Sequence, residues 1–463
     1  MISVKFVLVI IVFVVIYCEG KKGDKESIPI VFVILSQSNP YHKQLADQAK
    51  DRIIKQSLNL GWDVPNVYLT DEEWPEVIGS WTIFPLLNKI TEKFKSHHFW
   101  LFICEELTHV DVKKLTSLLE RFNASEDHFL GHALRDREAT IIHHFAFSED
   151  PSSFSYPEFS AGIILSKSLV KKISKKWNKH ASHDFSIDAK HEFAKFIWSN
   201  EISISLQNIP EFCLSRLSEK CVTWITESTP PCEYEVNRDD VCFFVKTCEK
   251  FHADRVPVVK NTWGKDASCL IFFSEKTDGS IPTINLGIPN VEFGHCAKTM
   301  AIIQYFIKSK YHNKNWLVIA DDDTLLSVPR LLKLLRCYNS SEAIALGERY
   351  GYDVLSGQGY NYITGGGGMV FSVETVRRLG TCQCPSKDSP DDMILGICLK
   401  KFGIPITHSK LFHQARPMDY APEYHHHPPV SFHKHWMIDP EQVYEEWLAD
   451  SDIRRDDTAH SEL

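Results

Sequence analysis

A run of three aspartates in the second half of the chain has the composition of a metal site. Asp321, Asp322 and Asp323 directly follow the apolar run Trp316 to Ala320. Three adjacent carboxylates repel one another unless a cation neutralises them. Carboxylate oxygens suit Mg²⁺ or Mn²⁺, and these ions commonly bridge substrate phosphates. The run therefore predicts a divalent-metal site, with an acidic surface turn as the alternative.

A second acidic pair, Asp391 and Asp392, follows Ser389 and Pro390. Ser389 is predicted to cap a helix that ends before Gly403. Acids in a first helical turn also complement the helix dipole, which is the simpler interpretation. A reaction in which a hydroxyl group attacks needs a carboxylate to take its proton. The pair is therefore a candidate for a general base.

Histidines gather after the second acidic pair, and one neutral imidazole could complete a metal site. They are His408, His413, His425, His426, His427, His433 and His435. The triple histidine stands beside two prolines and is predicted to lie in a loop. A dedicated zinc site is disfavoured because the ordered ligand spacing of such sites is absent.

Four glycines, Gly365 to Gly368, precede the apolar run Met369 to Ser372. Gly366 and Gly367 at the centre of this run permit close approach of the backbone to a ligand, or a bulge in a strand. A nucleotide-binding fingerprint is a poor alternative, because a helix does not follow at the required place.

The elements that must position these side chains alternate between strands and helices. Ile30 to Leu35, Val241 to Lys246 and Trp316 to Ala320 are apolar runs that predict buried strands. After the third run, Ser327 can cap a helix with Pro329 in its first turn. This alternation predicts a mainly parallel sheet. Ligands bind beyond the carboxyl ends of such strands, where the three aspartates stand.

The chain contains an internal duplication. Residues 100–131 align without gaps with residues 316–347, and the glycosylation acceptors Asn123 and Asn339 fall at the same place. Residues farther along, such as Ala161 to Ser166, match with different offsets. The chain is therefore predicted to hold two related α/β domains.

The first copy is predicted to be degenerate. It has Glu105-Glu106-Leu107 where the second copy has three aspartates, and Ala189 and Lys190 stand opposite Asp391 and Asp392. Joint loss of both acidic sites is expected if they serve one reaction in the second copy. The predicted boundaries are a signal peptide at 1–20, a non-catalytic domain at 28–215, a linker at 216–237, a catalytic domain at 238–435 and a tail at 436–463.

Both ends of the chain and its cysteines indicate the secretory pathway. Phe6 to Tyr17 is long enough for a signal-peptide core, with a short signal anchor as the alternative. The last four residues, His460 to Leu463, resemble a retrieval signal of the endoplasmic reticulum. Removing Cys18 with the signal leaves 12 of the 13 cysteines, an even number that suits a disulfide framework. We expect a soluble lumenal protein after cleavage, or alternatively a type II membrane anchor.

The composition is that of an ordinary globular protein. Of the 463 residues, 43% are hydrophobic and 24% are charged. The net charge of −9 argues against nucleic acid or an anionic membrane as a partner. Cys382-Gln-Cys384 could suggest a metal or redox site, but in an oxidising lumen we expect disulfides.

Five ordered motifs resemble those of the Fringe-type β1,3-glycosyltransferases and cover nearly the whole second domain. They are Val245 to Trp263, Asp321 to Asp323, Thr364 to Gly368, Pro390 to Asp392, and Leu411 to His413. The resemblance implies two GT-A-like, Rossmann-like domains, a UDP-sugar donor and Mn²⁺ or Mg²⁺.

The resemblance also implies roles for single residues. Asp323 and His413 are implied to bind the metal, with Asp321 beside them. His433 is the second choice for the histidine ligand. The residues implied to contact the donor are Arg255, Asp322, Lys246 and Thr247. The base is Asp392, next to Asp391.

The two-domain chain with a retrieval tail is similar to members that add glucose to O-linked fucose. The resemblance implies inverting β1,3 transfer from UDP-glucose onto folded, O-fucosylated thrombospondin type 1 repeats, with a retrieval receptor as a further partner. One alternative is a Fringe-like enzyme that uses UDP-galactose or UDP-GlcNAc. Another is a non-catalytic lectin or quality-control binder, which missing acids in both copies would favour.

Overall fold

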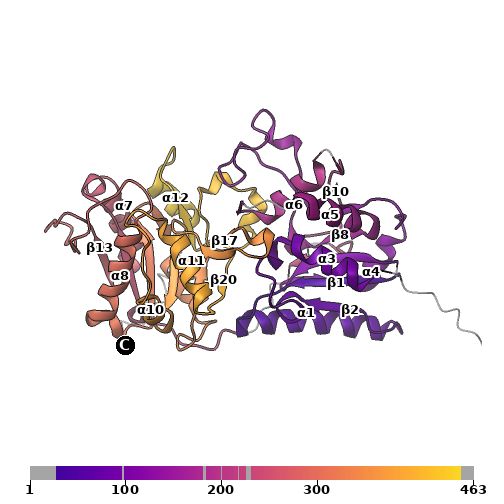
Figure 1. Cartoon of the computed structure of the whole chain (residues 1–463), viewed down its shortest axis with the longest axis horizontal. Helices are drawn as coiled ribbons and strands as arrows, with labels where there is room; N and C mark the ends of the chain where they lie inside the picture. The colour runs from indigo at the N-terminus through magenta and orange to yellow at the C-terminus, as the bar shows by residue number, and fades with distance from the viewer. Residues whose placement is uncertain are drawn as a thin grey trace, which may run out of the picture.

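The computed structural model describes residues 28–95, 98–180, 184–199, 201–216, 218–225 and 231–449. Two α/β domains lie side by side, each built on a six-stranded sheet (Figure 1). The predicted signal segment and the retrieval tail fall outside the described residues. None of the helices in the described part of the chain has the length and apolarity of a membrane span.

The first sheet has helices on both faces. In spatial order its strands are β10 (Gln207–Asn208), β5 (Phe129–Gly131), β8 (Ile163–Ser166), β3 (Trp100–Glu105), β1 (Ile30–Leu35) and β2 (Asn66–Leu69). Only β8 runs against its neighbours within this sheet. One face packs against α1 (Pro40–Asn59) and α4 (Val112–Leu119), and the other against α3 (Phe84–Lys93), α5 (Lys167–His180) and α6 (Ala189–Trp198).

The second sheet repeats this plan. Its strands are β13 (Leu270–Phe273), β12 (Val241–Lys246), β14 (Trp316–Asp321), β19 (Met369–Ser372), β16 (Ala345–Gly347) and β20 (Ile406–His408). Here β19 is the antiparallel member. The helices are α7 (Arg255–Asn261), α9 (Val328–Leu335) and α12 (Pro440–Trp447) on one face, and α8 (Cys296–Lys308), α10 (Val373–Leu379) and α11 (Asp391–Lys401) on the other. The shared strand order confirms the predicted fold class of two related α/β domains.

Small two-stranded antiparallel sheets complete each domain. They are formed by β4 (Thr108–Val110) with β11 (Thr223–Ile225), β15 (Thr324–Leu326) with β21 (Ser431–His433), and β6 (Ala133–Leu134) with β7 (Tyr156–Pro157). A short helix, α2 (Thr70–Glu73), follows β2.

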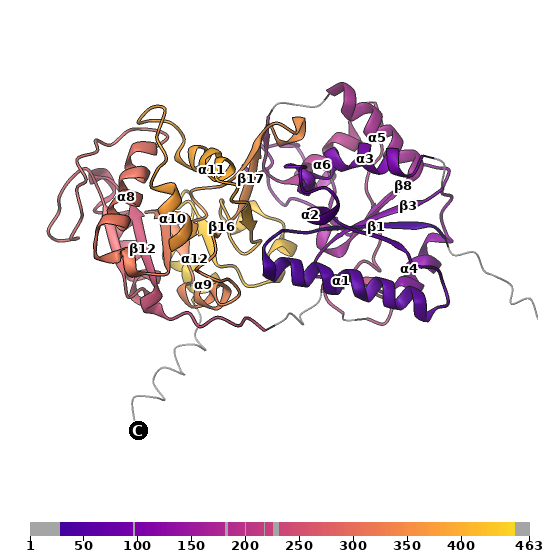
Figure 2. The same cartoon turned by 60° about the horizontal axis from the view of Figure 1, so that its bottom comes forward.

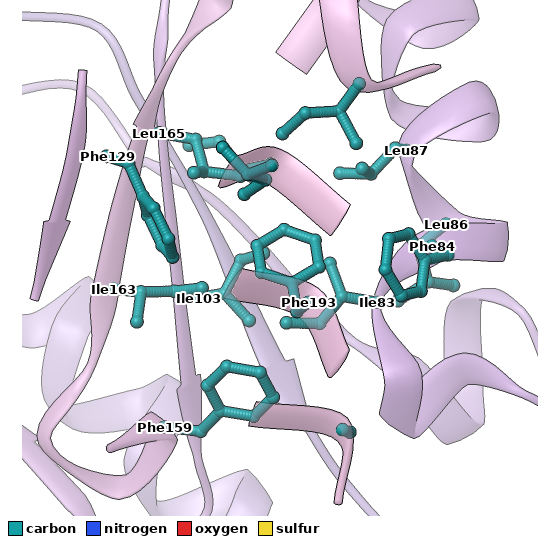
Figure 3. Packing of buried hydrophobic residues seen from close by; sticks show 14 of the residues in the cluster. Ile83, Phe84, Leu86, Leu87, Ile103, Phe129, Phe159, Ile163, Leu165 and Phe193 are labelled. Carbon is teal, nitrogen blue, oxygen red and sulfur yellow. The ribbon is translucent and has the colours of Figure 1, made fainter. Parts of the chain in front are cut away.

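The core of each domain comes from apolar strands that are buried on both faces. Figure 3 shows part of the first core, where Phe193 of α6 lies among Ile103 of β3 and Ile83 and Phe84 near the start of α3. The rings of Phe84 and Phe193 are 5.1 Å apart between centroids. Burying such a side chain contributes about 1.5–3 kcal/mol, so this layer holds the helices on the sheet.

The predicted helix starts differ in detail from the structure. Ser327 is the N-cap of α9, but its hydroxyl makes no hydrogen bond to the helix backbone. Helix α11 starts at Asp391 after Pro390, so the prediction that Ser389 caps it was wrong. The Ser389 hydroxyl instead accepts from the backbone N–H of Ser386.

Strand pairing and side chains join the two domains. Strand β17 (Arg349–Tyr352) pairs with β18 (Tyr360–Ile363) and, on its other edge, with β9 (Phe185–Ser186) of the first domain. Figure 2 shows β17 between the two halves. A buried hydrogen bond of 2.9 Å also joins His42 to Tyr338.

Five disulfides are present in the described part of the chain. They join Cys213 to Cys221, Cys232 to Cys337, Cys242 to Cys269, Cys296 to Cys384, and Cys382 to Cys398. The prediction that Cys382 and Cys384 form disulfides is confirmed. Cys104 and Cys248 are free thiols, so the even number of cysteines overstated the pairing. Cys104 lies within a central strand, where burial of the thiol raises its pKa to about 12.

Residues after 435, predicted as a tail, include helix α12. Tyr444 and Leu448 are buried in the core of the second domain. Both glycosylation acceptors follow equivalent helices, with Asn123 exposed and Asn339 half-buried.

Candidate active site

The carboxyl ends of β12 and β14 bring a lysine between two carboxylates. Lys246 is the register partner of Asp321 across these neighbouring parallel strands. Its Nζ lies 3.0 Å from Asp321 Oδ1 and 2.7 Å from Asp391 Oδ2 at the start of α11. Burial alone would lower the pKa of Lys246, but the two carboxylates outweigh it and raise the pKa above the usual value. Lys246 is therefore a fixed cation that joins both predicted acidic sites.

Asp391 has a supporting role in this arrangement. Its Oδ2 accepts hydrogen bonds from Lys246 and, at 2.5 Å, from the hydroxyl of Thr299 on α8. Burial would raise the pKa of Asp391, but the Lys246 charge and these hydrogen bonds hold it below the usual value. The sequence analysis missed Thr299, because a threonine inside a helix carries no local signal for a contact 92 residues away.

The next carboxyl, Asp392, is in a different environment. Burial and the neighbouring charge of Asp391 raise the pKa of Asp392 to about 6, although hydrogen bonds from the backbone of Met393 and Gly365 oppose the shift. The two carboxyls thus titrate in opposite directions from the ordinary value. Such separation is typical of a pair in which one member exchanges protons and the other stays charged.

The Asp322 carboxylate contacts two other residues for which the resemblance implies donor binding. Its Oδ2 accepts from the hydroxyl of Thr247 at 2.7 Å, and its Oδ1 lies 3.0 Å from Arg255 NH1. Burial and repulsion from Asp323 raise the pKa of Asp322 to about 6, against the effect of these two partners. Arg255 also lies 2.9 Å from Asp323. These contacts bring Asp322, Thr247 and Arg255 together, whereas Lys246, the other expected donor-binding residue, contacts Asp321 and Asp391.

Asp321, Asp323 and His433 form a cluster that could hold a metal ion, with ligand atoms all within 4.8 Å of one another. Pairing of β15 with β21 places His433 opposite Thr324, the residue after Asp323. His433 Nε2 lies 3.1 Å from Asp323 Oδ1 and 3.9 Å from Asp321 Oδ2. Two carboxylates and one imidazole suit Mn²⁺ or Mg²⁺.

The orientation of His433 supports this fit. Its Nδ1 lies 3.0 Å from the carbonyl oxygen of Gln414, which leaves Nε2 directed at the carboxylates. A backbone partner on the far nitrogen is the usual way in which proteins orient a metal-binding histidine.

His413, the first choice among the histidines, lies apart from this cluster. Its Nδ1 is 3.1 Å from the carbonyl oxygen of Ser431, and its ring stacks on Phe432 and contacts Tyr420. Burial lowers the pKa of His413 to about 3, so the ring is neutral. The structure thus favours the second choice, because His433 is the histidine whose Nε2 lies against Asp321 and Asp323.

The two central glycines bring the backbone close to these histidines. A Cβ atom on Gly366 would lie 2.3 Å from Nδ1 of His433, which is closer than any real contact of this kind. A Cβ atom on Gly367 would lie 3.4 Å from the backbone of His413. The close approach expected for Gly366 is therefore to a side chain of the cluster.

The first domain contains a separate buried cluster that the sequence analysis missed. His143 lies 2.6 Å from Asp136 and 3.0 Å from Asp188, and its ring stacks on His191. Burial would lower the pKa of His143, but the two carboxylates outweigh it and raise the pKa to about 9. Both nitrogens are occupied by carboxylates, so this group is a buried ion network that braces the loop before α6.

The fold and the site belong to a known class. A family model described as Fringe-like matches residues 85–219 and 236–454, which cover the first domain from α3 onward and the second domain with its whole acidic site. The chain therefore belongs to the Fringe-like family, and it is a glycosyltransferase.

Two relatives are similar to this chain over most of its length, and a third over a shorter part. The chain is 49% identical to a Beta-1,3-glucosyltransferase of Mus musculus, over 91% of this chain and 87% of the relative. It is 49% identical to a Beta-1,3-glucosyltransferase of Homo sapiens, over 94% of this chain and 87% of the relative. It is 30% identical to the Fringe glycosyltransferase of Drosophila melanogaster, over 29% of this chain and 33% of the relative.

Proposed function

We propose that this chain transfers glucose from UDP-glucose in β1,3 linkage, with inversion, to O-linked fucose on thrombospondin type 1 repeats. The observation that carries the reaction type is 49% identity to the two Beta-1,3-glucosyltransferases across both domains. The second domain also keeps a complete set of acids. The acceptor follows from the family resemblance of the two-domain arrangement.

Asp321, Asp323 and His433 are the residues that would hold Mn²⁺ or Mg²⁺. When bound, such an ion neutralises negative charge on a diphosphate leaving group. Arg255 is held by Asp322 and Asp323 at the edge of this cluster and supplies a fixed positive charge to the donor. Thr247 lies on the opposite side of Asp322 and helps to orient it.

Asp392 acts as the general base in this proposal. It takes the proton of the fucose 3-hydroxyl, which attacks the sugar on the face opposite the leaving group, so an α-linked donor gives a β product. A base whose pKa is near the working pH transfers protons most effectively, and the pKa of Asp392 is about 6. Lys246 ties Asp391 to Asp321 and thereby positions the base beside the donor site.

The location and partners follow from the sequence signals. We place the protein in the lumen of the endoplasmic reticulum, retained through its last four residues by a retrieval receptor and glycosylated at Asn123 and Asn339. The first domain is proposed to contribute to binding of the folded acceptor repeat. This role agrees with a domain that keeps its fold although it has lost its acids.

The test is a donor panel on the purified chain with Mn²⁺ and a fucosylated thrombospondin repeat. UDP-glucose, UDP-galactose and UDP-GlcNAc are compared at equal concentration, and the product mass is measured. We expect transfer of a hexose from UDP-glucose alone. Preference for another donor would favour the related transferases, and binding of the repeat without transfer from any donor would favour a lectin.

A further inference from the structure

A cavity of about 740 Å³ lies between the two domains. On the side of the first domain it is lined by Leu35 and Glu105, the last residues of β1 and β3. On the side of the second domain it is lined by Arg349 and Lys410. The cavity thus occupies the place, at the carboxyl ends of the strands, where an α/β sheet binds its ligands.

The duplication identifies this place as the counterpart of the candidate active site. Leu35 is the register partner of Glu105, as Lys246 is of Asp321. Ile225 is the register partner of Thr108, as His433 is of Thr324. The first copy therefore has apolar side chains, Leu35 and Ile225, where the second has the bridging lysine and the histidine.

These replacements remove the chemistry that a sugar nucleotide needs. Leu107 stands in place of Asp323, so a metal ion would have at most one carboxylate of the original three ligands, from Glu105. Leu35, Leu107 and Ile225 all line the cavity. The second copy would hold a diphosphate with a metal ion at these positions, and the first copy has apolar side chains there instead. The first copy therefore has a cavity at the position of the candidate active site, but it lacks the side chains that would bind a sugar nucleotide there.

Several of the charged groups at the cavity are paired with one another. Lys410 of the second domain forms ion pairs with Glu105 and Glu158, and Lys190 lies 3.0 Å from Glu158. His42 is hydrogen-bonded to Glu106. Because these charges are already compensated, a ligand need not bring a charge of its own.

Two polar side chains of the second domain, Arg349 and Glu348, also line the cavity. Within the described part of the chain, Nε of Arg349 is buried without a hydrogen-bond partner, and its guanidinium lies over the ring of Trp81 at 4.7 Å. Next to it in the sequence, burial raises the pKa of Glu348 to about 8, so this carboxyl is mostly uncharged at pH 7 and can donate a hydrogen bond as well as accept one. Aromatic surface is close by, because Trp81 and Tyr41 also line the cavity.

We propose that the interdomain cavity is a second, non-catalytic binding site for an uncharged carbohydrate of one or two sugar units. Its volume is in the usual range for small-ligand sites, about 300–1,000 Å³. Apolar and aromatic walls suit the faces of a sugar ring, and the fixed polar groups of Arg349 and Glu348 suit its hydroxyls. Lys333 and Pro428 line the cavity and are exposed, so its wall reaches the surface.

Saturation-transfer NMR on the full chain tests this site with D-glucose, D-galactose, D-mannose and methyl α-L-fucoside as probes. EDTA and excess UDP are present, so that the donor site of the second domain does not contribute. We expect transfer of saturation to at least one probe. The signal should fall at least fivefold in Leu334→Trp, which fills the cavity from α9, and in Leu107→Trp, which fills it from the first domain.

Leu332→Trp is the matched control, because Leu332 is also half-buried on α9 but does not line the cavity. Thermal unfolding confirms that each variant is folded. Absence of a signal from every probe overturns the proposal, and so does an equal signal in the folded cavity-filling variants and the control. The donor panel measures the second domain, so its outcome is independent of this test.

Discussion

The two domains share the bonds that build the site and differ in the side chains that would use it. In the first domain, the hydroxyl of Thr108 donates to the backbone oxygen of Ser160 at 2.9 Å. In the second, Thr324 donates to the backbone oxygen of Gly366 at 2.8 Å. A threonine and a backbone carbonyl are enough to hold this turn. The scaffold is therefore present also in a copy that lacks the candidate metal ligands.

One side-chain difference explains another. A Cβ atom on Gly366 would collide with the imidazole of His433, so the histidine requires the glycine. The first domain has Ile225 in place of the histidine, and Ser160 occupies the position of the glycine. The hydroxyl of Ser160 bonds to Glu158 at 2.5 Å and to Lys410 of the other domain at 3.2 Å. The former site has thus become part of the contact between domains.

The largest expected effect is the loss of turnover when the candidate base at the start of α11 is replaced. The equivalent position at the start of α6 in the first copy serves as the comparison. Asp392→Asn should lower kcat by about 10²–10⁴ because it removes the base, while UDP-glucose binding is retained. Initial rates and calorimetric titration of the donor measure the two quantities. Lys190→Gln is the matched control in the first copy, and we expect it to change kcat less than threefold in the folded protein. Near-normal turnover in Asp392→Asn would remove the residue from this role.

The next effect concerns the histidines. His433→Ala should raise the Mn²⁺ concentration for half-maximal activity by about 100-fold, because it removes one of three ligands. His413→Ala should leave that concentration unchanged, although loss of its stacking on Phe432 lowers the melting temperature. Manganese titrations followed by activity and by electron paramagnetic resonance check both. The reverse ranking would restore His413 as the ligand.

A smaller effect is expected from the backbone. Gly366→Ala should weaken Mn²⁺ binding by about 10–100-fold, because the added methyl displaces the ring of His433. Ser160→Ala changes the equivalent position of the first copy and should leave Mn²⁺ binding as it is. Equal metal affinity in Gly366→Ala and the unchanged chain would show that the glycine serves another purpose.

The smallest effect is the pH dependence of the intact enzyme. The base must be ionised, and the pKa of Asp392 is about 6. At saturating donor and Mn²⁺, kcat should therefore be constant above pH 7 and fall about tenfold per unit well below pH 6. A profile from pH 4.5 to 8 measures this. A flat profile down to pH 4.5 would mean that Asp392 ionises in the ordinary range for a carboxyl group.

Sequence analysis predicted much of the fold because the signals for it are local. The runs that begin at Ile30, Val241 and Trp316 are strands β1, β12 and β14, since short continuous apolar segments are typical of strands in a sheet that is covered on both faces. The cap at Ser389 was predicted wrongly, because its hydroxyl is taken by Ser386 in the preceding loop. Such competition between nearby hydrogen bonds has no pattern in the sequence.

By itself, the sequence determined that the chain has two related domains and that the acids are confined to the second. Duplication, strand patterns and acidic runs are properties of residue order, so they are visible without coordinates. Only the tertiary structure decided that Lys246 bridges Asp321 and Asp391, and that His433 faces the acids. Contacts between residues 75 to 145 positions apart depend on which strands pair and in what register. The tertiary structure also encloses a cavity between the domains, at the position of the first domain that is equivalent to the candidate active site. This cavity could not be predicted from the individual residues.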